Sequence, residues 1–473
     1  MPTSNASPVR ESDASGSSPS PSFIALTPLF LFLALFFGVG LYYSVLGIER
    51  PFYQIHPSVA TLPALVLAIV LGAASVKKNL RTLLRGIGDE TIMTMCIVFL
   101  LAGAFAGVME AIGGVEATVD LGLALLPDQF ILPGLFLISA FISLSMGTSM
   151  GTLAAVAPIA VGVSGSTELS VTITLGAVVG GAMFGDNLSI ISDTTIAATR
   201  TQGCSMTDKF RANLWIAVPA AVVTTIGLFL ASTGASDAAE GTVNVWLVLP
   251  YLIVLGLAVA GLDVFVVLGA GIVLAGATGI IAGDYGMAPF AGDIYDGFES
   301  MFGIMLLAMF IGGLGELIRR QGGLAWLAQA IRRSTAFLRL KGRRAGETGI
   351  AAMAALSDVL IANNTVAILL SGTVARDLAK QYDIDAPRSA SLLDIFACIV
   401  QGVLPYGGQI LLAASLAGLS PMALVGAIHY CWALLVVAII SIAFQIGRGP
   451  GVTTKTASVN PYNTASTTEA PAS

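Results

Sequence analysis

The sequence predicts an all-α polytopic membrane protein, and three observations carry this prediction. Of its 473 residues, 56% are hydrophobic and 11% are charged, whereas a soluble domain contains about 25% charged residues. Apolar stretches recur from Phe23 to Ile446, and many reach the roughly 20 residues that a helix needs to cross a hydrocarbon core of about 30 Å. These stretches are continuously apolar, whereas a transmembrane β-barrel needs alternation.

The elements follow in order from the N-terminus. Residues 1–22 are rich in serine and proline and residues 447–473 in threonine and serine, so both are predicted to be disordered tails. Residues 23–89 hold the leading transmembrane helices. Over the whole chain the apolar runs predict about ten full spans, at residues 23–48, 58–76, 90–112, 170–199, 212–232, 245–261, 264–282, 300–318, 389–417 and 420–446.

The charged loops orient these spans. Basic residues cluster at Lys77 to Arg85, Arg200 to Arg211, Arg319 to Arg344 and Arg376 to Arg388, and again in the C-terminal tail. Acidic connections alternate with them along the chain. Because basic loops face the cytoplasm, we expect a multi-pass protein of the plasma (inner) membrane with both termini cytoplasmic.

Two stretches, residues 130–165 and 348–376, do not fit as single spans, because each leaves and returns to loops of the same sign. Small polar residues interrupt each stretch in its middle, at residues 145–152 and 363–365. They predict two re-entrant helical hairpins with polar tips inside the membrane. Residues 324–340 combine apolar and arginine side chains, which predicts a basic interfacial helix on the cytoplasmic surface.

The two halves of the chain match each other. Aligning residues 100–102 with 306–308 places Glu110 on Glu316, and the match continues through both hairpins to Asn187 and Gln409. The signs of the loops are reversed between the halves, so the copies are predicted to lie upside down relative to each other. The predicted order after the leading helices is a first inverted repeat (90–211), connecting transmembrane helices (212–299), a second inverted repeat (300–418) and a last transmembrane helix (419–446).

Inverted repeats with broken helices are the architecture of secondary transporters. The chain has no Walker motif and no soluble segment large enough for a nucleotide domain, which argues against an ATP-driven pump. Nothing in it indicates nucleic-acid binding, an enzyme or a cofactor. The four cysteines are far apart without a CxxC pair, so they predict neither a zinc site nor a disulfide framework.

Carboxylates within apolar spans are the candidates for ion binding, because an ionisable group at membrane depth costs about 2.5 to 3.5 kcal/mol. The densest polar patch is Gly185 to Thr195. Asp186, Ser189 and Asp193 would share one face of a helix, and the glycines at 180, 181 and 185 favour a break that frees carbonyl groups. The six candidate carboxylates are Glu110, Asp186, Asp193, Glu316, Asp358 and Asp394.

Structural roles stay open for these residues. Asp186 and Asp193 could cap helices, and the polar tip residues could cap the hairpin helices. Asp394 could be solvated near the cytoplasmic loop, and the two glutamates lie near span ends, where headgroups would satisfy them. Asp358 is expected near the inner mouth of its hairpin.

The patch favours cation/proton exchange. Na⁺ prefers oxygen ligands, and a carboxylate can hold Na⁺ or a proton but not both in the same place. Asp186 and Asp193 are therefore expected to exchange Na⁺ for protons. The further oxygen ligands expected beside them are Asn187, Ser189, Ser192 and Thr194, with the hairpin tips at Thr148, Ser149 and Thr152 and at Asn363, Asn364 and Thr365 closing the site.

The segment Gly185 to Thr195 resembles the NhaC family of Na⁺/H⁺ antiporters, whose members carry Gly-Asp-x-Leu-Ser-x-x-Ser-Asp-Thr-Thr. Residues 147–152 and 363–365 also look like that family, and the similarity runs from about residue 60 to 445. The first tip lacks an asparagine, and residue 187 is Asn where some relatives have Lys. Similarity to the wider ion-transporter superfamily implies that Ser149, Thr152, Asn363, Asn364 and Thr365 are site residues.

The resemblance therefore implies an antiporter that exports Na⁺, with Li⁺ as a second candidate, in exchange for H⁺. It also implies an alternative, a Na⁺- or H⁺-coupled carrier of a small carboxylate or amino acid. No basic residue is predicted at membrane depth, since Arg376 and Arg388 belong to a cytoplasmic loop, and this favours a cation-only site. A homodimer in the lipid bilayer is expected by analogy with other transporters.

Overall fold

The computed structural model describes residues 20–46, 54–125, 127–232, 244–283, 285–337 and 342–446. Its regular elements in these ranges are all helices, which confirms the all-α class. Most of the two predicted tails, residues 1–19 and 447–473, lies outside the described residues. The first half contains η1 (Ile24–Leu26), α1 (Thr27–Val45), α2 (Pro57–Leu71), α3 (Val76–Ile87), α4 (Glu90–Ala111), α5 (Gly114–Leu125), η3 (Asp128–Phe130), α6 (Ile131–Met146), α7 (Ser149–Ser166), α8 (Val171–Leu188), α9 (Asp193–Gln202) and α10 (Met206–Ala231).

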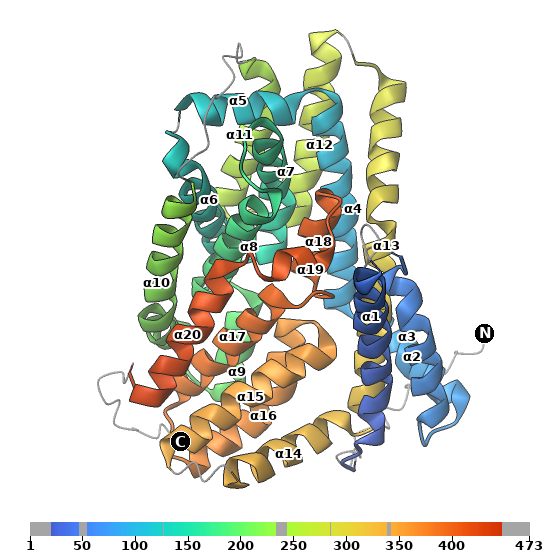
Figure 1. Cartoon of the computed structure of the whole chain (residues 1–473), viewed down its shortest axis with the longest axis vertical. Coiled ribbons are helices and arrows are strands. Elements are labelled where there is room, and N and C mark those ends of the chain that lie inside the picture. The colour runs from blue at the N-terminus through green and yellow to red at the C-terminus, as the bar shows by residue number, and fades with distance from the viewer. Residues whose placement is uncertain are drawn as a thin grey trace, which may run out of the picture.

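The second half repeats a similar order of elements. It contains α11 (Val245–Val259), α12 (Val264–Ala282), α13 (Met287–Arg320), α14 (Gly323–Phe337), α15 (Arg343–Ile361), α16 (Asn364–Gln381), α17 (Ala386–Val403), α18 (Gly408–Leu416), α19 (Pro421–Val425) and α20 (His429–Phe444). A long helix, a helix on its own, two helices joined by a short break and a broken long helix follow one another as α4 to α9 and again as α13 to α18. Figure 1 places α5 at the top of the view and α14 at the bottom, with α6 and α7 in the upper half and α15 and α16 in the lower half.

Eight helices in the described part of the chain are long and apolar enough to cross a membrane, which makes this a multi-pass membrane protein. Seven of the ten predicted spans fall on them, and the other three correspond to the shorter apolar helices α2, α11 and α20. The eighth is α7, which was predicted as part of the first hairpin. An extensive buried apolar core lies between the central helices, with Phe99, Phe105 and Phe136 fully buried in it.

Several segments predicted as charged loops are helical. The basic segment after residue 75 forms α3, which packs Leu83 and Ile87 against Gly313 of α13 while Lys77 and Arg81 are exposed. The acidic connection after residue 113 forms α5, and α13 begins thirteen residues earlier than the predicted span at residue 300. These helices have polar faces, and a search for continuous apolar runs does not detect them.

The glycines of α8 allow close packing of helices, and the predicted break follows them within the patch Gly185 to Thr195. A Cβ on Gly181 would clash with the carbonyl oxygen of Phe136 on α6, and one on Gly185 would lie 2.6 Å from the backbone nitrogen of Leu144. Small residues at these positions let α8 lie directly on α6. The helix continues past all three glycines and ends at Leu188, and the break at residues 189–192 follows.

Candidate functional site

Four breaks in helices supply the backbone of the candidate site. They separate α6 from α7 at residues 147–148, α8 from α9 at 189–192, α15 from α16 at 362–363, and α17 from α18 at 404–407. Each break exposes carbonyl groups at one helix end and N–H groups at the next helix start. Such ends can bind ions when they are buried in protein.

Side chains and backbone connect these breaks. Gly147, in the left-handed conformation with φ of +72°, lies so close to the α8–α9 loop that a Cβ would come 3.2 Å from the backbone nitrogen of Ser192. Thr365 at the start of α16 donates a hydrogen bond of 3.1 Å to Asp193 at the start of α9. Gln409 on α18 donates one of 3.0 Å to Ser149 on α7. The break between α6 and α7 and the break between α15 and α16 thus both contact the segment that joins α8 to α9, and α18 contacts the start of α7.

Asp186 is the buried carboxylate of the first polar cluster. Its Oδ2 accepts a hydrogen bond of 2.8 Å from the Ser149 hydroxyl, and the residue is 4% exposed. Behind Ser149, Gln409 donates to the hydroxyl, and Gln401 donates to the Gln409 carbonyl oxygen at 2.7 Å. Among the described residues, Asp186 Oδ1 and the side-chain oxygen of Gln401 have no hydrogen-bond partner. The cluster therefore offers two open oxygen acceptors in a buried position.

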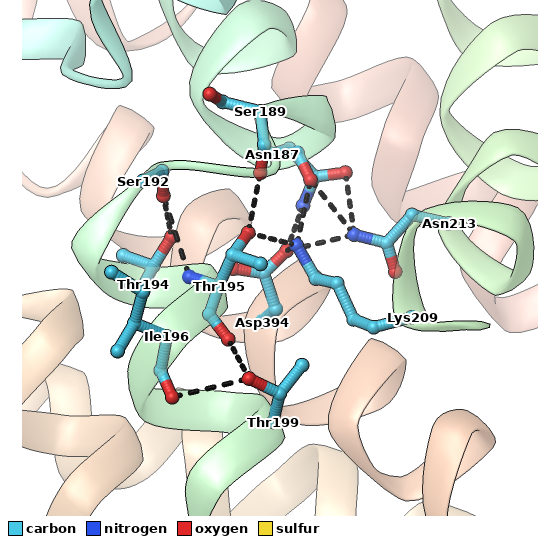
Figure 2. Close-up of polar contacts among 10 residues, drawn as sticks. All are labelled: Asn187, Ser189, Ser192, Thr194, Thr195, Ile196, Thr199, Lys209, Asn213 and Asp394. Carbon is cyan, nitrogen blue, oxygen red and sulfur yellow. Dashed lines mark hydrogen bonds and ion pairs between the residues drawn. The ribbon is translucent and has the colours of Figure 1, made fainter. Parts of the chain in front are cut away.

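Asp394 on α17 is the buried carboxylate of the second polar cluster, shown in Figure 2. Its Oδ2 lies 2.7 Å from Lys209 Nζ and accepts hydrogen bonds from the side-chain amides of Asn213 at 2.8 Å and Asn187 at 2.9 Å. The Lys209 and Asp394 side chains are 1% and 0% exposed. The expectation that Asp394 is solvated near a cytoplasmic loop is wrong, because a buried ion pair holds it.

The sequence pattern assigns Lys209 to the cytoplasmic loop between Arg200 and Arg211 and so does not identify it as a site residue. The structure starts α10 at Met206, capped by the Ser205 hydroxyl. Lys209 and Asn213 are four residues apart on α10 and lie on one face. Both donate to the carbonyl of Asn187 at 2.9 Å, which is free because α8 ends one residue later. The expectation that no basic residue lies at the depth of the site is therefore wrong; the available signal was this polar pair at the start of an apolar run.

The other predicted carboxylates lie in different surroundings. Asp193 begins α9, is exposed and accepts a hydrogen bond from Thr365. Because the helix is broken at residues 189–192, Asp193 does not share one continuous helix face with Asp186 as expected. Asp358 is fully buried on the last turn of α15, beside the break and not at the mouth of a hairpin. Among the described residues neither of its carboxylate oxygens has a hydrogen-bond partner.

Glu110 and Glu316 do not join either cluster. Glu316 is paired with Arg319 at 2.5 Å and Arg320 at 2.9 Å at the end of its own helix. Glu110 lines a separate cavity of about 420 Å³ together with Asp293.

The predicted hydroxyl and amide ligands serve largely as helix caps and local bridges. Thr148, Ser192 and Asn363 accept from the backbone at the starts of α7, α9 and α16. The Ser192 and Thr194 hydroxyls are 2.6 Å apart, and Ser189 donates to the Leu144 carbonyl at 3.0 Å. Thr152 and Asn364 also make local hydrogen bonds. The Thr152 hydroxyl donates to the Thr148 carbonyl, and the Thr365 backbone N–H donates to the Asn364 side-chain oxygen.

Comparison with known proteins finds similarity to antiporters. Residues 23–234 match the family described as the Na⁺/H⁺ antiporter family. The Na⁺/H⁺ antiporter NhaC of Alkalihalophilus pseudofirmus is 26% identical over 350 residues, which cover 66% of this chain and 73% of that protein. The arginine/ornithine antiporter ArcD of Halobacterium salinarum is 24% identical over 372 residues, 70% of this chain and 75% of that protein.

A third relative matches a shorter region. The malate-2H⁺/Na⁺-lactate antiporter of Bacillus subtilis is 29% identical over 203 residues, or 42% of each chain. These relatives are all antiporters, and the resemblance seen at Gly185 to Thr195 is confirmed. The chain is thus similar to NhaC-type Na⁺/H⁺ antiporters over about two thirds of its length, and its residues 23–234 match the Na⁺/H⁺ antiporter family.

Proposed function

We propose that this protein is a secondary antiporter that exchanges Na⁺, with Li⁺ as a second candidate, for H⁺ by alternating access. The observation that carries the proposal is Asp186, a buried carboxylate with one oxygen held by Ser149 and the other open, at the meeting point of broken helices. A buried carboxylate without a basic partner is unfavourable as a bare anion. It therefore takes up either a cation or a proton, and this competition couples the two ions.

The first contacts for the cation come from the cluster around Asp186. Ser149 and the open oxygen of Gln401 are joined to Asp186 by the hydrogen-bonded chain through Gln409. Asp193 lies across the α8–α9 break and is the second exchanging carboxylate, contacted by Thr365 from the other hairpin. The other predicted ligands shape the breaks and supply carbonyl or hydroxyl oxygens as the breaks open and close; they are Thr148, Thr152, Asn187, Ser189, Ser192, Thr194, Asn363 and Asn364. No cofactor is needed for this exchange.

The repeated order of elements supports a mechanism of alternating access. The helices α4 to α9 and α13 to α18 form the two proposed inverted repeats, and their counterparts α5 and α14 lie at opposite ends of the view in Figure 1. Rocking of one repeat against the other would expose the buried site first to one side and then to the other. The exposed basic residues of α3 support a cytoplasmic position for this helix. The proposal also includes a location in the plasma membrane with both termini on the cytoplasmic side. A homodimer remains part of the proposal by analogy alone.

The test is Na⁺ addition to purified protein in liposomes that contain a pH-sensitive dye, with no organic solute present. The expected result is a change of lumenal pH on adding Na⁺ but not K⁺, which persists when the membrane potential is clamped. Liposomes with Asp186→Asn protein are the matched control and should show no change. A wild-type protein that moves no protons in response to Na⁺ or Li⁺ would refute the proposal.

A second candidate is a Na⁺- or H⁺-coupled carrier of an amino acid or small carboxylate, favoured by the match to three quarters of the arginine/ornithine antiporter. The geometry supports it less well for a carboxylate, because Lys209 is already paired with Asp394. The same liposomes distinguish the two functions. Uptake of a labelled amino acid or dicarboxylate that needs a Na⁺ or proton gradient, without Na⁺-driven proton movement in its absence, would identify the carrier.

A further inference from the structure

The ammonium group of Lys209 lies in a shell made of oxygen atoms. Its Nζ is 2.7 Å from the Asp394 carboxylate, 2.9 Å from the Asn187 carbonyl and 2.7 Å from the Thr195 hydroxyl. A carboxylate, a carbonyl and a hydroxyl are also the ligand types that hard metal cations take in proteins. The lysine thus carries one positive charge into a position built like a site for a small monovalent cation.

The shell is held in place by contacts that do not involve Lys209. The Asn187 carbonyl is free because α8 ends at Leu188, and Asn213 also donates to it. The Thr195 hydroxyl donates its own proton to the Ser189 carbonyl at 2.7 Å, so its lone pairs are left for a cation. Asp394 keeps two amide donors on Oδ2, while its Oδ1 has no hydrogen-bond partner among the described residues.

Two buried carboxylates therefore flank the end of α8 and differ in one respect. Asp394 has a tethered cation, whereas no ion pair to Asp186 occurs within the described residues. Asp186 and Asn187 are neighbours in the chain, and Asn187 donates to Asp394. Asp394 thus already has a positively charged partner, whereas Asp186 is open to an exchangeable one.

We propose that Lys209 is a tethered cation that fills a second monovalent-cation site at Asp394 and so confines the transported ion to the Asp186 side. The inference rests on the proposed function and deepens it, because it sets how many cations the chain binds. Without the ammonium, the same oxygen shell would take Na⁺ from solution. The latent site would then bind one more Na⁺ in each chain.

The test is the number of Na⁺ ions bound at saturation by purified protein, measured with radioactive Na⁺ in a scintillation proximity assay. Lys209→Met keeps an unbranched side chain, one heavy atom shorter, and removes the charge. We expect this variant to bind one more Na⁺ per chain than the wild type. Lys209→Arg, which keeps the charge, and the double variant Lys209→Met with Asp394→Asn, which removes the carboxylate, should both bind the wild-type number.

Each other outcome is informative. A folded Lys209→Met protein with the wild-type number of bound Na⁺ would overturn the inference while leaving the antiporter proposal intact. If Lys209→Met is recovered only in high Na⁺ and the double variant is recovered without it, the inference is supported. If Lys209→Met cannot be recovered at any Na⁺ concentration, whether or not the double variant folds, Na⁺ cannot replace the ammonium and the inference fails. A wild-type protein that binds no Na⁺ would instead refute the proposed function.

Discussion

The buried ion pair between Lys209 and Asp394 provides a quantitative test of the structure. Asp394→Asn keeps the size and shape of the side chain and removes its negative charge. The carboxylate oxygen that changes is held by three donors at 2.7, 2.8 and 2.9 Å, and both charged side chains are at most 1% exposed. The variant would therefore leave an ammonium group in the interior without its counter-charge.

The expected loss of stability is large. Removing one partner of a buried ion pair costs about 3 to 5 kcal/mol, because the remaining charge is uncompensated. Glu316→Gln is the matched control, since it removes a carboxylate whose partners Arg319 and Arg320 are 39% and 53% exposed. Glu316 itself is 11% exposed, but pairs with such solvent-exposed partners contribute only about 0.2 to 1 kcal/mol.

The assay is the free energy of unfolding in mixed micelles titrated with SDS and followed by tryptophan fluorescence. Asp394→Asn should be several times more destabilising than Glu316→Gln, and adding Lys209→Met to Asp394→Asn should restore most of the loss. Equal effects of the two single variants would refute the assignment of a buried charge pair. A double variant as unstable as Asp394→Asn alone would show that Asp394 stabilises the protein through contacts other than Lys209.

Three further predictions concern separate parts of the chain. Asp186→Asn should abolish Na⁺-driven proton movement in liposomes, whereas Asp193→Asn, at an exposed carboxylate, should mainly raise the Na⁺ concentration for half-maximal exchange; the reverse ranking would contradict the site described above. Gly185→Ala should cost about 1 to 3 kcal/mol of unfolding free energy, because its Cβ meets the backbone of α6, whereas Gly227→Ala in α10 meets nothing within 4 Å and should be neutral or stabilising by about 0.5 to 1 kcal/mol. Burial raises the pKa of Cys204, in the loop before α10, to about 11; the thiolate fraction should therefore rise about tenfold per pH unit below that value, and maleimide labelling that is lost in Cys204→Ser should accelerate accordingly between pH 7 and 9. A labelling rate that stays flat over this range would contradict the raised pKa.

Features that depend on neighbouring residues could be predicted from the sequence. Continuous apolar runs identified the long membrane helices, and small polar residues around Thr148 and Asn363 marked positions where helices end. Both residues carry a side-chain oxygen that accepts from a backbone N–H at a helix start, which is a local interaction. The amphipathic helices α3 and α5 escaped the prediction because their charges were interpreted as loops, although their periodicity is also local.

The composition of the site depends on contacts that no local pattern contains. Asn187 and Asp394 are 207 positions apart, and Gln409 and Ser149 are 260 apart, yet each pair is hydrogen bonded. The sign of the charge made Lys209 look like a loop residue, because basic residues near a span end normally face the cytoplasm. Only the three-dimensional structure shows that its ammonium reaches a carboxylate on another helix. This ion pair also bears on transport. Of the two buried carboxylates beside the end of α8, only Asp186 lacks a paired cation among the described residues and remains free to exchange one.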